Sequence, residues 1–463
     1  MRYLQSHRTV LIEFNELSPV LLERFIDRGQ LPAFAAFRRD SAVFTTDAGE
    51  DPPLLEPWIQ WPTVHSGLPY AEHQVFALGD GRRKLRTPLL GDVLSAAGIA
   101  VGIFAAMNMN YGPLAGYVLP DPWDLDGQAH PKSLQAFYRT IASAIQESSH
   151  YGLPAPSELA RFALFLVRNG LSPTTIWSVL SQLAAERRAP ALRWRRASVL
   201  DHLQYDVFRH LNRRHNVRFA SFFSNSTAHY QHYYWRNMEP QIFEVPPPEE
   251  SSPSLADAVR HGYRSMDRLL ARFMKDEPDA LLILCTALSQ EPWTGAAKQT
   301  FRPRRFAELF AFAGVDVNVD AVKPMMAEQF QVELPDTTAA ARTEAALNTL
   351  TLDGHPVLTL YRNEKTLQAG CMPAHPITSG ATVRRAYDGA TRPFRELFSP
   401  VHTTRSGRHH RQGALWIRTG EHRVVSERVD LTDIAPTILA QFGVARPDHM
   451  KGRPLRLDAR VRD

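Results

Sequence analysis

Two histidines three positions apart, His229 and His232, stand in an aromatic-rich run between residues 225 and 235. Residues three apart share one face of a helix, so the two imidazoles could bind a single metal ion. The alternative, which the aromatic neighbours favour, is that hydrogen bonds satisfy both rings. The spacing alone leaves both interpretations open.

A carboxylate, Glu56, directly precedes Pro57. Carboxylates act as nucleophiles in some hydrolases, and they also bind metals. Proline suits the first turn of a helix, where a negative charge is stabilised by the helix dipole. Glu56 is therefore either a catalytic group or a residue that starts a helix, and the sequence does not separate the two.

The elements that must position these residues alternate between strand and helix. Strand-like runs begin near Val10, Ile99, Val217, Ala280 and Ala414, and helix signals separate several of them. This alternation predicts a mostly parallel central sheet with helices on both faces. Between 157 and 214 the pattern is helical only, with Ser172 and Pro173 placed to start one helix and Ser18 placed to cap an earlier one.

These patterns predict a core interrupted twice. The α/β core occupies 1–150, 216–300 and 386–463, a helical insertion occupies 151–215, and a small α/β insertion occupies 301–385. The second insertion leaves the sheet just after a strand's carboxyl end, where ligands bind in open α/β sheets. We therefore expect residues 301–385 to lie beside the site and to shape access to it.

The composition is that of an ordinary globular protein and excludes several classes. The chain has 463 residues, 44% hydrophobic and 22% charged, with a net charge of +5 and two cysteines. Two cysteines exclude a disulfide framework. No nucleic-acid motif, membrane-spanning run or export signal is present, which predicts a cytoplasmic protein with neither a nucleic-acid partner nor a membrane span.

Four segments in a fixed order resemble one known family. They are Leu31-Pro32-Ala33-Phe34, the run 67–73 (GLPYAEH), the run 90–98 (LGDVLSAAG), and 433–455, which begins DIAPTIL and ends GRPL. Together they resemble the type I phosphodiesterase and nucleotide pyrophosphatase branch of the alkaline phosphatase superfamily. The resemblance implies an alkaline-phosphatase-like α/β fold and a phosphoester of a nucleotide, sugar or glycan as the ligand.

The same resemblance implies a depleted catalytic site. Members hold two divalent metals with aspartates and histidines beside a threonine or serine nucleophile. The matching positions carry Asn15, Pro57, Ala228, Ala287 and Leu288, whereas His232 and His409 (or His410) match metal-binding histidines. Two close cations without anionic ligands repel strongly. The resemblance therefore implies at most one divalent ion, zinc or manganese, or none.

The residual polar residues are expected to meet at one sheet edge. Asn15, Glu56, His232, Gln290 and His409 each follow a strand or open the next helix, and such loops emerge together in a parallel sheet. Glu16 could replace the missing aspartate, although its place before a helix favours a supporting role there. The polar side chains expected to bind an anionic substrate are Asn15, Asn225, Gln290 and Arg236, the last because guanidinium groups bind phosphate well.

Two functions remain open at this stage. One is a phosphoester hydrolase with a rearranged site, which the retained polar residues favour. The other is a catalytically inactive relative that serves as a binding or scaffold protein, which Pro57, Ala287 and Leu288 favour. Measuring metal content and phosphoester turnover separates them.

Overall fold

The computed structural model describes residues 6–124, 127–147, 156–247, 249, 251–295, 299–325, 329–373, 377–401 and 405–457. Within the described residues, no helix is long and apolar enough to span a bilayer. The chain divides into two compact units: residues 239–247 and 292–406 form the smaller unit, and the rest forms the larger one.

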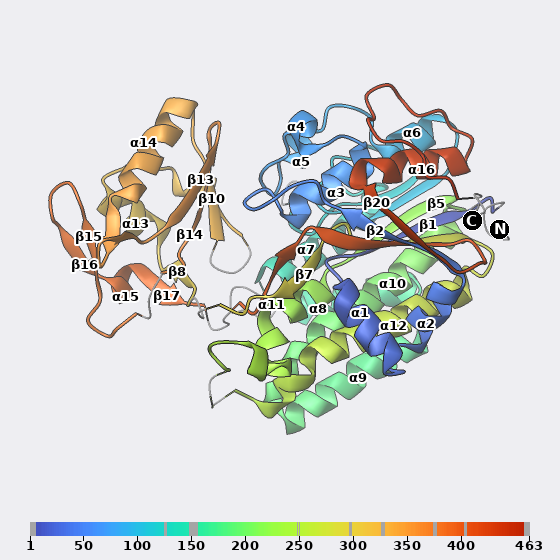
Figure 1. Cartoon of the computed structure of the whole chain (residues 1–463), viewed down its shortest axis with the longest axis horizontal. Coiled ribbons are helices and arrows are strands. Elements are labelled where there is room, and N and C mark those ends of the chain that lie inside the picture. The colour runs from blue at the N-terminus through green and yellow to red at the C-terminus, as the bar shows by residue number, and fades with distance from the viewer. Residues whose placement is uncertain are drawn as a thin grey trace. The chain divides into compact units, whose positions relative to one another are not determined.

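An eight-stranded sheet forms the centre of the larger unit (Figure 1). Its order is β20 (Arg423–Asp430), β2 (Ser41–Asp47), β19 (Gln412–Arg418), β6 (Leu281–Cys285), β1 (Thr9–Phe14), β5 (Phe219–Ser224), β3 (Val101–Phe104) and β4 (Gly116–Leu119). Only β19 runs against its neighbours; every other pairing is parallel. The five strands expected from the sequence all lie in this sheet, so the predicted fold class is confirmed.

The central position of β1 follows from its composition. All six residues of its TVLIEF sequence are buried, as expected for a parallel strand covered on both faces. It pairs with β5 on one side and β6 on the other, with Thr9 opposite both Phe219 and Leu281. The carboxyl ends of these three strands therefore lie together at one edge of the sheet.

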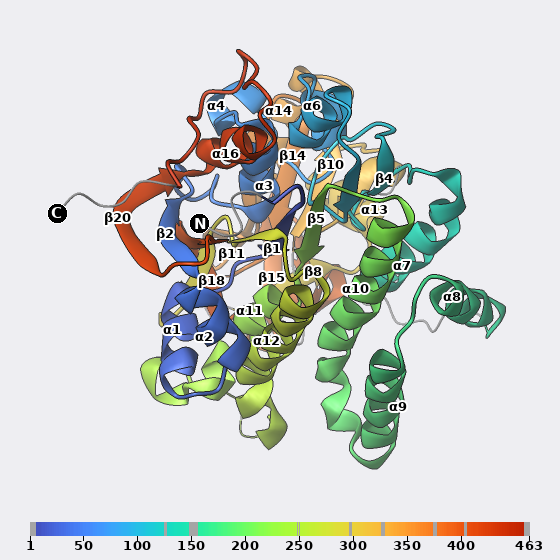
Figure 2. The same ribbon diagram turned by 90° about the vertical axis from the view of Figure 1, so that its right-hand side faces the viewer.

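Helices cover both faces of the sheet (Figure 2). One layer contains α1 (Pro19–Asp27), α2 (Pro32–Arg39), α10 (Arg196–Arg214), α11 (Ser226–Met238) and α12 (Ala258–Asp276). The other contains α3 (Pro57–Ser66), α4 (Tyr70–His73), α6 (Leu90–Ala96) and α16 (Ile434–Gln441). The short helix α5 (Gly81–Lys84) follows α4, and α7 (Gln135–Glu147) follows β4.

The helix-only pattern corresponds to α8 (Pro156–Arg168), α9 (Pro173–Arg188), a 3₁₀ segment (Pro190–Arg195) and α10. Ser172 caps α9 as expected, because its side chain accepts a hydrogen bond from the Thr175 amide. The expected Ser18 cap is wrong. The Ser18 side chain makes no capping bond, and its amide instead donates to the Tyr263 hydroxyl and to Gln231 Oε1.

The smaller unit has its own apolar core, and the stretch 301–385, for which the sequence predicts a small α/β insertion, falls within its bounds. One four-stranded sheet has the order β13 (Thr359–Asn363), β14 (Thr366–Gly370), β10 (Gln329–Glu333) and β9 (Val322–Pro324). Another has the order β12 (His355–Pro356), β11 (Leu350–Leu352), β15 (Thr382–Arg385) and β16 (Thr391–Pro393). Its remaining elements are β8 (Phe301–Pro303), β17 (Phe398–Pro400), α13 (Phe306–Ala313), α14 (Thr337–Asn348) and α15 (Phe394–Leu397). Its role in shaping access to the site stays a prediction.

Candidate functional site

Three segments distant in sequence bring a carboxylate and two imidazoles together at the carboxyl edge of the central strands. Glu16 stands two residues after the end of β1. His232 lies on α11, which follows the neighbouring strand β5. His409 lies on β18 (Gly407–His410), which pairs with β7 (Ser289–Pro292) and leads into β19. Because β19 is antiparallel, its start lies at the same edge as the ends of β1 and β5.

One carboxylate oxygen lies between the two rings. Oε2 of Glu16 lies 3.2 Å from Nε2 of His232 and 3.4 Å from Nε2 of His409. One ligand atom from each of the three residues lies within 4.8 Å of the other two. Glu16 is 1% exposed, whereas the His232 and His409 side chains are 15% and 11% exposed. A small ligand from solvent can therefore approach from the imidazole side.

The far nitrogen of each ring faces a backbone carbonyl. Nδ1 of His232 lies 3.1 Å from the Gly407 oxygen, and Nδ1 of His409 lies 2.9 Å from the Leu55 oxygen. A carbonyl oxygen only accepts hydrogen bonds, so each Nδ1 carries the proton and donates it. In the neutral ring each Nε2 then presents a lone pair towards Glu16.

Amide side chains hold the Glu16 carboxylate in place. Gln290 Nε2 donates to Oε2 at 2.5 Å, and Asn15 Nδ2 donates to Oε1 at 2.9 Å. Asn15 Nδ2 also lies 2.7 Å from Asn225 Oδ1, while Trp61 Nε1 donates to Asn15 Oδ1. The Glu16 backbone has a φ of 60°, a left-handed conformation that is strained for a non-glycine residue. The surrounding network fixes a strained residue so that its carboxylate points at the imidazoles.

The charge of Glu16 is favoured by this setting. Burial alone would raise the pKa of Glu16, but the imidazoles of His409 and His232 outweigh burial and hold that pKa well below its usual range. A carboxylate that stays ionised in a buried position requires a cationic partner, either a protonated imidazole or a bound metal ion.

The three residues offer ligand atoms that could hold a single divalent ion. Two neutral Nε2 lone pairs facing a carboxylate oxygen are mutually repulsive unless a cation lies among them. Atoms about 2.0–2.1 Å from a tetrahedral zinc ion are about 3.3–3.4 Å apart, and the observed Glu16 separations are 3.2 and 3.4 Å. Two histidines and one glutamate also match a known zinc ligand set, with the Nδ1–carbonyl bonds as the outer shell.

Glu56 contacts the far side of one imidazole. Its Oε2 lies 3.3 Å from Nδ1 of His409. Glu56 does start helix α3, but its side chain makes no capping bond. Its carboxylate is therefore directed at His409 rather than at the helix amides, and it meets the nitrogen that points away from Glu16.

Known structures resemble the chain only distantly. Murine ectonucleotide pyrophosphatase/phosphodiesterase 5 matches with a TM-score of 0.42 and 9% identity over 96% of each chain. Phosphonoacetate hydrolase from Sinorhizobium meliloti, with bound phosphonoacetate, matches with a TM-score of 0.42 and 13% identity over 95% of this chain and 96% of that one. Alkaline phosphatase PafA matches with a TM-score of 0.44 and 12% identity over 97% and 98%. At this level the matches assign no activity to the chain.

In comparisons of sequence, no protein-family model and no curated protein matches the chain.

The other residues singled out from the sequence lie around this cluster in different ways. His229 is exposed on α11, and its ring centroid lies 4.8 Å from that of Tyr233, so it does not join the cluster. Arg236 is buried one helical turn after His232, and burial lowers its pKa. Ala287 and Leu288 are fully buried.

Sequence reasoning assigned Glu16 the wrong side-chain environment and missed a second buried network. The position of Glu16 before a helix predicts that its charge stabilises the start of that helix. In the structure its carboxylate instead faces His232 and His409. In this second network, His65 Nε2 lies 2.9 Å from Glu13 Oε1 and His65 Nδ1 lies 2.7 Å from the Tyr111 hydroxyl. A glutamate inside an otherwise apolar strand was the available sequence signal for this second network.

Proposed function

We propose that this protein is a phosphoester hydrolase of the alkaline phosphatase type that works with one divalent metal ion, zinc or manganese. Glu16, His232 and His409 would hold that ion. The observation that supports the proposal is that Glu16 Oε2 faces the Nε2 atoms of both His232 and His409. The Nδ1 atom of each ring bonds to a backbone carbonyl oxygen, so each Nε2 is left to face the carboxylate. The sequence resemblance supports a phosphoester as the substrate class.

The chain's own residues prepare the ligand set in this proposal. The Gly407 and Leu55 carbonyls fix the tautomers, so both Nε2 lone pairs remain available for the metal. Glu56 adds negative charge behind His409 and makes that imidazole a stronger ligand. A divalent ion at this place would polarise a phosphoryl oxygen as a Lewis acid. We therefore propose a positioning role for Glu56 rather than the nucleophilic role considered from the sequence.

Fewer residues are proposed to contact the substrate than the sequence suggested. Asn15 and Gln290 are 1% exposed, and their amide nitrogens donate to Glu16. These two residues would position the carboxylate instead of touching the substrate. Asn225 is half-buried, so its amide group is the better candidate for a direct contact. Arg236, which is buried, would act on an anionic substrate through its charge.

A phosphoester panel tests this proposal directly. The full-length protein, loaded with zinc or manganese, should hydrolyse p-nitrophenyl phosphate, bis-p-nitrophenyl phosphate or a nucleotide p-nitrophenyl ester. Activity should disappear with a chelator and in His232→Ala, and it should persist in His422→Ala, which changes an exposed histidine outside the cluster. Absence of turnover with every ester and both metals would refute the hydrolase proposal.

A second candidate is a binding protein without catalysis. The family's nucleophile position carries Pro57, which has no hydroxyl, and the buried Ala287 and Leu288 offer no ligands for a second ion. In that case the chain would bind one metal and an anionic phosphoester without cleaving it. Metal-dependent binding of a nucleotide in the absence of turnover distinguishes this candidate from the hydrolase.

A further inference from the structure

Helices α8 and α9 each expose large apolar side chains. Large hydrophobic side chains are normally exposed singly in soluble proteins, whereas a contiguous group marks an interaction site. Here Val167 on α8 is 64% exposed, and Trp177 and Leu180 on α9 are 72% and 55% exposed. The exposed set on the two helices is Leu164, Val167, Ile176, Trp177, Leu180 and Leu183. We call these six residues the hairpin patch.

Helical spacing places each half of the hairpin patch on one helix face. On α9 the exposed residues 176, 177, 180 and 183 follow the i, i+1, i+4, i+7 pattern of a single apolar stripe. The buried residues of α9, Thr175 and Glu186, lie three turns apart on a neighbouring face of the helix. On α8 the inward side is marked by Phe165, whose ring stacks 4.4 Å from that of Phe137. Both helices therefore have an inner packed face and an outer apolar face.

Arginines border the hairpin patch. Between residues 156 and 196 the chain has seven arginines and two glutamates, a surplus of five positive charges that equals the net charge of the whole chain. Arg161, Arg168, Arg187 and Arg188 are exposed. Glu186 does not offset them at the surface, because it is buried and paired with Arg196. Exposed apolar residues with basic neighbours are one feature of helices that lie in a membrane interface.

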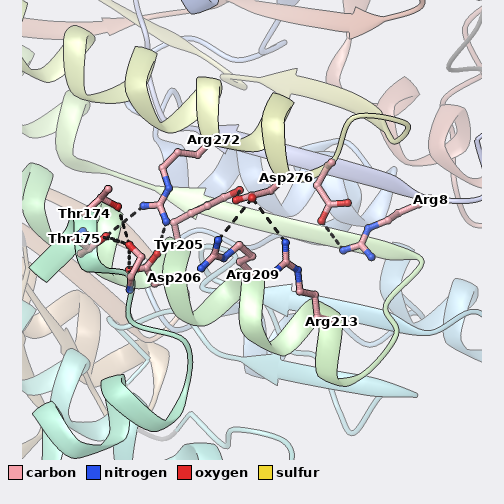
Figure 3. A network of polar contacts seen from close by, with 11 residues as sticks. Arg8, Thr174, Thr175, Tyr205, Asp206, Arg209, Arg213, Arg272 and Asp276 are labelled. Carbon is pink, nitrogen blue, oxygen red and sulfur yellow. Dashed lines mark hydrogen bonds and ion pairs between the residues drawn. The ribbon is translucent and has the colours of Figure 1, made fainter.

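A polar network fixes the hairpin to the core (Figure 3). Asp206 on α10 is fully buried and accepts hydrogen bonds from Arg272 of α12 and from the amide and hydroxyl of Ser172. Arg272 also donates to the Thr175 hydroxyl at 3.4 Å. These bonds hold the start of α9 against α10 and α12. The exposed apolar side chains of α9 therefore belong to a helix that is anchored to the core.

We propose that the hairpin patch docks on an anionic lipid bilayer, with Trp177, Leu180 and Val167 entering the interface and the arginines contacting phosphate headgroups. Charge complementarity selects this occupant. An isologous dimer through the same face would place the arginines of one copy against those of the other, whereas a negative leaflet attracts all of them. This inference concerns a surface separate from the Glu16 cluster and does not depend on the proposed hydrolase activity.

Vesicle sedimentation with the full-length protein tests the inference. The protein should sediment with phosphatidylcholine vesicles that contain about 30% phosphatidylserine and not with pure phosphatidylcholine. Each basic residue near an anionic surface contributes about 1 kcal/mol, so Arg187→Glu with Arg188→Glu should lower the bound-to-free ratio by at least about tenfold. Trp177→Glu with Leu180→Glu should lower it similarly, and high salt should weaken binding of the wild type.

Val20→Glu provides the matched control, because Val20 is 66% exposed on α1, outside the hairpin. It should bind vesicles as the wild type does, and thermal melting should show that all variants are folded. The inference is overturned if the wild type does not bind phosphatidylserine vesicles, or if Val20→Glu lowers binding as much as the hairpin variants. It is also overturned if the wild type is a dimer that Trp177→Glu dissociates while vesicle binding stays unchanged.

Discussion

Oε2 of Glu16 lies 3.2 Å from Nε2 of His232, while Nδ1 of that ring is engaged by the Gly407 carbonyl. His409 repeats the arrangement from another segment, with Nδ1 on the Leu55 carbonyl. Two imidazoles with fixed tautomers and one buried carboxylate thus form a ligand set that a single cation completes. This ligand set offers one carboxylate and two imidazoles, which is enough for one ion.

Replacing Glu56 by glutamine should weaken metal binding without abolishing it. The carboxylate lies on the far nitrogen of His409, and groups in that position typically change metal affinity by about 10–100-fold. Competition with a chromophoric chelator measures the change, and Glu72→Gln, at an exposed glutamate, should leave affinity unaltered. Unchanged affinity in Glu56→Gln would remove Glu56 from the site, and a loss as large as that of Glu16→Gln would make it a direct ligand.

Gly407→Ala should damage the site through packing. A Cβ at this position would meet the side chain of Gln290 and would lie 2.8 Å from the Gln231 carbonyl oxygen, so the backbone that supplies the acceptor of His232 must shift. We expect a loss of about 1–3 kcal/mol in the free energy of unfolding, together with weaker metal binding. Denaturant unfolding and chelator competition measure the two effects. Gly380→Ala, which has open space for its Cβ, should change neither quantity. If Gly407→Ala had the stability and the metal affinity of the wild type, the close approach at Gly407 would not matter and the prediction would be wrong.

The pH dependence of stability should include a contribution from Asp201. Burial raises its pKa to about 7, although a Ser226 hydroxyl donates to it. The folded state then holds the proton more tightly than the unfolded state, in which the aspartate pKa is near its ordinary value of 3.8. This contribution is fully present below pH 4 and declines as pH rises to about 7, by up to about 1.4 kcal/mol per pH unit.

Asp201→Asn removes that titration and keeps the shape of the protonated side chain. Stability curves of both proteins from pH 4.5 to 7.5 should therefore diverge, with the wild type losing stability relative to the variant as pH rises. Parallel curves across this range would show that Asp201 does not titrate there.

The buried ion pair between Asp206 and Arg272 should contribute strongly to the helical layer. Asp206→Ala removes the acceptor of Arg272 and of Ser172, and breaking a buried pair from one side costs about 3–5 kcal/mol. Asp257→Ala, which breaks a half-exposed pair with Arg260, should have little effect on urea unfolding. Equal losses in the two variants would show that burial does not control the strength of these pairs.

The fold was predictable because the central strands are almost continuous apolar runs. β1, β5 and β6 are fully buried, and each is followed by a loop or helix start with polar residues. Parallel connection then brings the polar residues that follow these strands to one edge, which is why Asn15, His232 and Gln290 could be placed together from the sequence alone. In the structure Asn15, Gln290, His232 and His409 contact Glu16, and Glu56 contacts His409; their functional roles stay predictions.

The role of Glu16 could not be predicted in the same way. Its direction depends on a left-handed φ of 60°, and sequence patterns do not specify such a conformation for glutamate. The tautomers of His232 and His409 depend on carbonyls of residues far away in sequence, Gly407 and Leu55. His229 shows the converse case: a spacing of three on a helix puts it near His232 in sequence, yet its ring lies beside Tyr233.

Metal stoichiometry of the purified full-length protein tests the central claim most directly. After zinc or manganese loading and removal of free metal, elemental analysis should give one ion per chain. Glu16→Gln and His232→Ala should each lose it, because each removes one of three ligand atoms that lie within 4.8 Å of one another. Circular dichroism verifies that the variants are folded. Two tightly held ions per chain, or one ion that remains in both folded variants, would contradict the account.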